Sequence, residues 1–191
     1  MAAGDLNNDG KTDFAIGSTD ALYIIYGGSS DGAITPLFKS LNSPGFYMGK
    51  GDFNGDGITD LVYTTQKEIR IYYGSNVGIN TTPDVRINDF SALYDNYGNI
   101  PVYNAIGIPN EAKDLNGDGA DDLVVISSTG VLIYYTYTDS MTGKKQLKMQ
   151  PSVFDVFPDP IGTQPKVIML DDAIIYCNSL NATGNCERLD F

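Results

Sequence analysis

A nine-residue pattern, D-x-N-x-D-G-x-x-D, occurs three times in this chain and limits the folds available to it. The copies occupy residues 5–13, 52–60 and 114–122, which we name loop I, loop II and loop III. Each copy places three carboxylates and one amide oxygen in a short turn. Closely spaced carboxylates repel one another unless a cation lies between them, so the pattern indicates a cation-binding turn.

Calcium suits these donors, because it is a hard cation that takes about 6–8 oxygen ligands and tolerates irregular geometry. Glycine at the sixth position permits the sharp turn. We predict three calcium sites, each built from the side chains at positions 1, 3, 5 and 9 and the carbonyl oxygen at position 7. The predicted ligands are Asp5, Asn7, Asp9, Lys11 and Asp13 in loop I; Asp52, Asn54, Asp56, Ile58 and Asp60 in loop II; and Asp114, Asn116, Asp118, Ala120 and Asp122 in loop III.

A turn without metal is the alternative for each loop, since Asp, Asn and Gly are ordinary turn formers. One copy would therefore be weak evidence. Three copies with the same five positions filled favour calcium over a plain turn.

The residues after each loop exclude the EF-hand and the related dockerin loop. Those loops carry an acidic ligand at position 12 and continue into a helix. Position 12 is Ile16, Tyr63 and Val125 here, and an apolar, strand-like run follows the acid at position 9. Each loop is therefore predicted to join two strands.

The loops resemble the FG-GAP repeat of integrin α-subunit propellers and the related bacterial VCBS-type repeats. The matching segments are residues 3–10, 51–57 and 113–119, and the resemblance covers roughly residues 1–140. The flanks match less well. The Phe-Gly pair of the family stands here as Ile106-Gly107, with Ile161-Gly162 as a second candidate.

Strand-like pieces surround each loop in a repeating order. Continuous apolar runs after the loops are typical of strands covered on both faces. Four-stranded antiparallel units at this period predict an all-β fold, a β-propeller with calcium loops. A β-sandwich with calcium in its turns is the competing fold, and the equivalent loop position in each unit favours the propeller. The expected strands lie in residues 1–4, 13–17, 21–26 and 34–38; then 46–50, 61–65, 68–73 and 84–87; then part of 102–112, 123–127, 131–137 and part of 147–157.

The chain is predicted to be a single domain of 191 residues, with blades at about 1–40, 41–90 and 100–157 and a partial blade at 158–191. Because residue 1 falls inside a strand, we expect a segment of a larger propeller. The alternatives are a compact four-bladed ring and closure by assembly, since an open array leaves unpaired strand edges.

The charge of the chain excludes some functions. The chain has 24 acidic and 12 basic residues, for a net charge of −12, and nine of the acids are the aspartates at positions 1, 5 and 9 of the loops. Such acidity argues against nucleic-acid partners. Histidine is absent, and we found no nucleophile motif or phosphate loop, so we expect no enzyme. No apolar run is long enough to insert in a membrane, and no secretion signal starts at Met1. We expect either that a native signal was removed or that the chain is a fragment.

Cys177 and Cys186 flank a polar turn, and we expect a disulfide between them if the protein is exported. Two reduced cysteines are the alternative. The tripeptides that begin at Asn80 and Asn181 fit the glycosylation pattern, which also arises by chance.

The resemblance implies an extracellular or cell-surface recognition scaffold that binds a protein partner or mediates adhesion, alone or within a larger surface protein or toxin. A carbohydrate-binding propeller is the alternative, with Tyr94, Tyr97 and Tyr103 as candidate sugar platforms. Extra residues at 88–101 lengthen the second unit, and we predict that residues 91–101 form an exposed loop opposite the calcium sites that contributes Tyr94 and Tyr97 to partner binding. The alternative is that these residues form a surface loop with no binding function.

Overall fold

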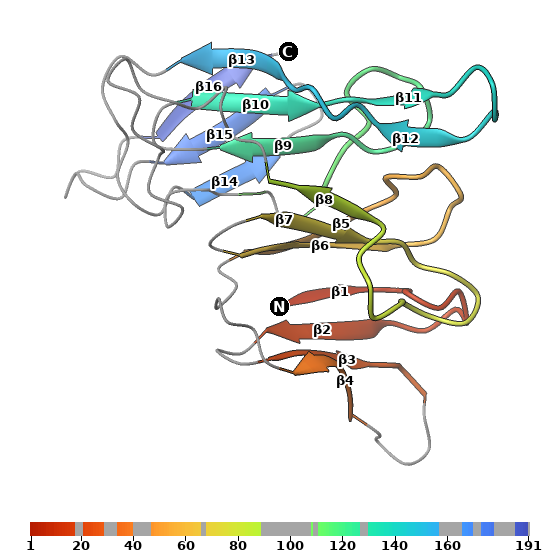
Figure 1. Ribbon diagram of the computed structural model, residues 1–191. Coiled ribbons are helices and arrows are strands. Elements are labelled where there is room, and N and C mark those ends of the chain that lie inside the picture. The colour runs from red at the N-terminus through yellow and green to blue at the C-terminus, as the bar shows by residue number, and fades with distance from the viewer. Residues whose placement is uncertain are drawn as a thin grey trace.

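The computed structural model describes residues 1–17, 21–28, 34–39, 47–65, 68–88, 108, 111–126, 130–156, 166–169, 173–177 and 186–190. Within these residues the regular structure consists of strands alone, and every pair of named strands is antiparallel (Figure 1). The predicted all-β class is confirmed. Among these residues no helix is both long and apolar enough to cross a membrane.

The first two sheets each contain four strands in sequence order, and we call them blade 1 and blade 2. Both agree closely with the predicted strands. Blade 1 comprises β1 (Ala2–Gly4), β2 (Asp13–Gly17), β3 (Ala21–Ile25) and β4 (Ile34–Lys39). Blade 2 comprises β5 (Met48–Gly51), β6 (Asp60–Thr64), β7 (Ile69–Tyr72) and β8 (Val85–Ile87).

A third sheet, blade 3, repeats this plan with an insertion. Its named strands are β9 (Leu123–Ile126), β10 (Gly130–Tyr134) and β13 (Ser152–Val156), in the order β13-β10-β9. An isolated bridge between Lys113 and Asp122 stands where the first strand would pair. The insertion is a separate hairpin of β11 (Thr136–Thr138) and β12 (Lys145–Leu147).

The last part of the chain forms a fourth sheet. Its strands are β14 (Lys166–Met169), β15 (Ala173–Cys177) and β16 (Cys186–Asp190), in sequence order. These three strands lie within residues 158–191, where a partial blade was predicted.

Blade 2 lies between blade 1 and blade 3, and the sheets are stacked face to face (Figure 1). Alternate residues of β6 serve the two contacts, because side chains in a strand point alternately to opposite faces. Leu61 and Tyr63 pack against blade 1, whereas Val62 packs in the cluster that includes Leu123 and Val125 of blade 3. All of β6 and β9 is buried, so the prediction of two covered faces is confirmed for these strands.

The same prediction is wrong for β2. Phe14 is 39% exposed and Ile16 is 38% exposed, while Ala15 between them is buried. Ala15 points toward blade 2, whereas the opposite face of β2 meets no cover among the described residues. The apolar sequence of β2 therefore predicted burial of a face that no described residue covers.

Several predicted features lie outside the described residues. They are the loop at 91–101 with Tyr94 and Tyr97, Tyr103, the Ile106-Gly107 and Ile161-Gly162 pairs, and Asn181. Asn80 is described, and it is exposed.

Candidate metal centre

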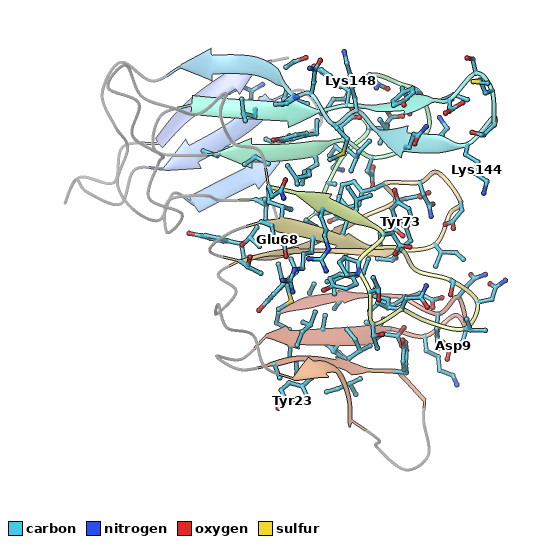
Figure 2. The ribbon with its side chains drawn as sticks, viewed as in Figure 1. Asp9, Tyr23, Glu68, Tyr73, Lys144 and Lys148 are labelled. Atoms are coloured by element: carbon cyan, nitrogen blue, oxygen red, sulfur yellow. The ribbon has the colours of Figure 1, made fainter. Side chains whose placement is uncertain are left out.

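The three loops occupy equivalent places in the fold. Loop I joins β1 to β2, loop II joins β5 to β6, and loop III runs into β9 after the Lys113 bridge. All three lie along one edge of the molecule, on the right in Figure 1. Asp9 and the β11–β12 hairpin bearing Lys144 mark this edge in Figure 2, whereas Glu68 lies toward the other end of blade 2. The fold thus gathers the predicted site residues on one side.

The aspartate at position 1 organises the turn in each loop. In loop II, Asp52 Oδ1 accepts a hydrogen bond from the Asp56 N–H at 3.1 Å, and Asp52 Oδ2 accepts one from the Gly57 N–H at 2.8 Å. Asp5 and Asp114 accept the equivalent bonds in their loops. The carboxylate therefore holds the loop backbone closed.

Glycine at position 6 is required by the backbone. Gly10, Gly57 and Gly119 have φ angles of 79°, 81° and 87°, a region that side chains with a Cβ rarely adopt. The predicted reason for this glycine is confirmed.

The side chains at positions 3 and 5 fold back onto the same turn. Asn54 Oδ1 accepts the Asp56 N–H at 3.0 Å, and Asp56 Oδ1 accepts the Ile58 N–H at 2.8 Å. Loops I and III repeat both bonds. The oxygens at positions 1, 3 and 5 are thus held around one turn by hydrogen bonds from the loop backbone.

The aspartate at position 9 is fully buried and joins the loop to the sheet. In loop II, Asp60 Oδ2 accepts the Phe53 N–H at 2.7 Å, and Asp60 Oδ1 accepts the Gly74 N–H at 2.8 Å. Asp13 accepts from Leu6 and Gly27, and Asp122 accepts from Leu115 and Thr136. The second donor lies 14 residues after the aspartate in every blade. This structural role was missed in the sequence, although the regular spacing is visible there.

Burial leaves negative charge poorly compensated in loop II. Desolvation raises the pKa of Asp60 to about 8; the hydrogen bonds from Gly74 and Phe53 act against this change, and the charges of Asp52 and Asp56 add to it. Burial likewise raises the pKa of Asp122. A cation at the loop would favour the ionised carboxylates, so the donor set fits a hard divalent ion.

The carboxylates alone do not make a metal cluster. In the part of the chain that the structure describes, no group of three or more Asp, Glu, Cys or His side chains is arranged to hold a metal ion. Each loop offers hydrogen-bonded acceptors, and a complete calcium shell would also need the asparagine oxygen and the main-chain carbonyl at position 7.

Loop III differs from the other two at position 5. Lys145 Nζ donates to the Asp118 carbonyl oxygen and lies 3.2 Å from Asp118 Oδ1. The Thr136 hydroxyl lies 3.2 Å from the same Oδ1. Burial acts to raise the pKa of Asp118, but the hydrogen bonds from Lys145, the Ala120 N–H and Thr136 lower it overall. Asp118 is therefore ionised and already has a cationic partner.

The loops are also linked to one another through the backbone. The Thr59 N–H donates to the Asp5 carbonyl at 3.3 Å, and the Asp121 N–H donates to the Asp52 carbonyl at 2.8 Å. Asp121 Oδ2 in turn accepts the Asp52 N–H at 2.7 Å. The residue at position 8 of loops II and III thus donates a hydrogen bond to the residue at position 1 of the preceding loop. These bonds couple the three candidate centres.

Comparison with known proteins gives one family match. Residues 1–35, which contain β1, loop I, β2 and β3, match the family model described as FG-GAP repeat. No curated protein matches the chain. Residues 1–35 therefore carry an FG-GAP repeat, which confirms the predicted resemblance for blade 1.

Proposed function

We propose that the chain is a calcium-stabilised extracellular scaffold that binds a protein partner. FG-GAP repeats in general serve extracellular protein recognition and adhesion. The observation that carries the calcium proposal is the equivalence of the loops: each holds the oxygens at positions 1, 3 and 5 around one turn, and all lie on one edge. Such regularity is expected of a shared ligand.

Calcium would be held by the side chains at positions 1, 3, 5 and 9 and by the carbonyl at position 7. When bound, the ion supplies positive charge to turns in which neighbouring carboxylates repel one another. Since the backbone of each loop is bonded to the next, order in one loop is transmitted along the edge. In this proposal calcium stiffens the scaffold and takes no part in chemistry.

Binding rather than catalysis fits the composition. The chain has no histidine, and the clustered carboxylates serve as acceptors within the turns. We therefore propose no enzymatic activity. We propose that partner recognition lies on the side opposite the loops, where the sequence predicts an exposed loop at residues 91–101.

An array of extracellular proteins and an array of glycans, each probed in calcium and in EGTA, would test this function. We expect calcium-dependent capture of a protein. Binding to glycans alone would replace the proposal with the carbohydrate-binding alternative, and capture that is equal in EGTA would remove calcium from it.

A further inference from the structure

The β11–β12 hairpin brings two side chains to loop III that loops I and II lack. Thr136 begins β11, and Lys145 begins β12. The position of Thr136, 14 residues after the last aspartate of the loop, is occupied by Gly27 in blade 1 and by Gly74 in blade 2. The insertion therefore changes the surroundings of one candidate centre only.

Lys145 acts as an internal cation for loop III. Its ammonium contacts both the carbonyl and the carboxylate of Asp118, and its side chain is only 20% exposed. The aliphatic part of Lys145 lies against Gly55 of loop II, which fixes its course between the two loops. Among the described residues, the equivalent Asp9 and Asp56 have no ion pair.

The Thr136 hydroxyl enters the predicted ligand set. Its Oγ1 lies 3.1 Å from Asp122 Oδ1, 3.2 and 3.3 Å from the two Asp118 carboxylate oxygens, and 3.4 Å from the Ala120 carbonyl. These are oxygens of positions 5, 7 and 9. A hydroxyl has one proton to donate, so it satisfies one of these acceptors and takes up space among the rest.

The asparagine of loop III is also diverted. Asn7 and Asn54 donate from Nδ2 to the position-5 carboxylate of their own loops, at 3.2 and 3.1 Å. Asn116 Nδ2 instead donates to the Thr136 carbonyl at 3.0 Å. Three of the five predicted donors in loop III, at positions 3, 5 and 9, thus contact the hairpin through their side chains.

We propose that Lys145 and Thr136 neutralise and hold loop III in place of calcium, so that the ion binds loops I and II in preference. This inference rests on the proposed calcium function. A fixed ammonium beside Asp118 repels a divalent ion at that turn, and its displacement must precede binding. Loop III then remains ordered when calcium is scarce, whereas loops I and II respond to it.

Titration calorimetry with calcium chloride on the whole chain tests this assignment. We expect two tight sites and a third that is weaker by about tenfold or more. Lys145→Met keeps the apolar stem and removes the charge, and Thr136→Gly restores the residue of the other blades. The double variant should show three sites of similar affinity. Lys144→Met makes the same charge change at an exposed neighbour and should leave two tight sites.

Three equally tight sites in the unaltered chain, or a Lys145→Met protein that titrates like the unaltered one, would overturn the inference while leaving the calcium function intact. A weaker third site after Thr136→Gly would also overturn it, because Thr136 would then be a ligand. Calcium binding at no loop would overturn the proposed function together with the inference. Circular dichroism of each variant confirms that it is folded.

Discussion

At the scale of single residues, we expect position 5 to decide whether a loop can hold a cation. Asp56 Oδ1 accepts the Ile58 N–H at 2.8 Å, and its other oxygen accepts from Asn54 Nδ2. We expect Asp56→Ala to remove the calcium of loop II and to leave loop I unchanged, because each loop takes its donors from contiguous sequence. Calorimetry should show one site fewer. An undiminished stoichiometry would contradict the assignment, and Asp84→Ala, an exposed acid outside the loops, is the matched control.

The turn in each loop could be predicted from the sequence, but the hydrogen bonds between the loop side chains and distant backbone groups could not. The repeated glycine at position 6 implied a sharp turn, and its positive φ in all three loops agrees with that. The buried aspartate at position 9 was expected to be a ligand only, yet both oxygens of Asp60 accept backbone N–H groups from distant residues. Such partners depend on how the third strand returns to the loop, which residue spacing alone does not fix.

At the scale of strands, apolar runs and the turns between them predicted most elements of the first two blades. The third blade shows where such reasoning fails. A continuous strand was expected over residues 131–137, but β10 ends at Tyr134. The Thr136 N–H donates to Asp122 Oδ1, so this residue leaves the β9 ladder and starts a hairpin of its own. The Asp122 carboxylate thus takes a backbone N–H that a longer strand β10 would have used in its ladder.

Contact between blades depends on glycine at the end of β5. A Cβ at Gly51 would lie 2.8 Å from the Ala112 Cβ and 3.1 Å from Asp121 Oδ2. We expect Gly51→Ala to lower the free energy of unfolding by about 1–3 kcal/mol through this overlap. Urea denaturation measures the loss. Adding Ala112→Gly should recover part of it, and two additive losses would show that the blades do not meet as described.

An ion-pair network at the other end of blade 2 predicts a dependence on pH. Glu68 accepts from Arg70 Nε at 2.6 Å and from Arg86 Nη1 at 2.7 Å. Burial acts to raise the Glu68 pKa, but the two arginines lower it overall. A depressed pKa means that the stabilisation is present above the ordinary value of 4.5 and is lost as the pH falls through the folded pKa.

Glu68→Gln should therefore cost about 1 kcal/mol near neutral pH, a modest figure because Arg86 is half exposed and its attraction is screened. The difference between variant and parent should shrink as the pH falls below 4.5. Urea denaturation at several pH values measures it. A constant difference across the pH range would refute the role of this network.

The fourth sheet bears on the predicted disulfide. The register of β15 and β16 places Cys177 directly opposite Cys186. Directly opposed residues in an antiparallel pair have Cα atoms about 4.5–5.5 Å apart, which is within the range that a disulfide spans. We expect the bridge in oxidised protein, where closing a loop of about 10 residues contributes roughly 2–3 kcal/mol. Mass spectrometry of unreduced peptides tests this, and two free thiols would exclude it.

At the scale of the whole molecule, the blades stack because strands such as β6 pack against a neighbouring blade on each face. Backbone hydrogen bonds between the loops connect the blades along one edge. The repeat pattern predicted this arrangement because equivalent loops require equivalent sheets. Phe14 and Ile16 are exposed on the open face of β2. This could not be predicted, because an apolar sequence does not show whether another element packs against the strand.

Thermal unfolding in EGTA, in magnesium and in millimolar calcium measures whether calcium stabilises the fold. Two sites with dissociation constants about tenfold below the calcium level add roughly 2–3 kcal/mol, which raises the Tm by about 5–10 °C in a domain of this size. We predict this rise in Tm in calcium. In magnesium we predict little change in Tm, because magnesium demands octahedral geometry. A Tm that is the same in all three conditions would contradict this prediction.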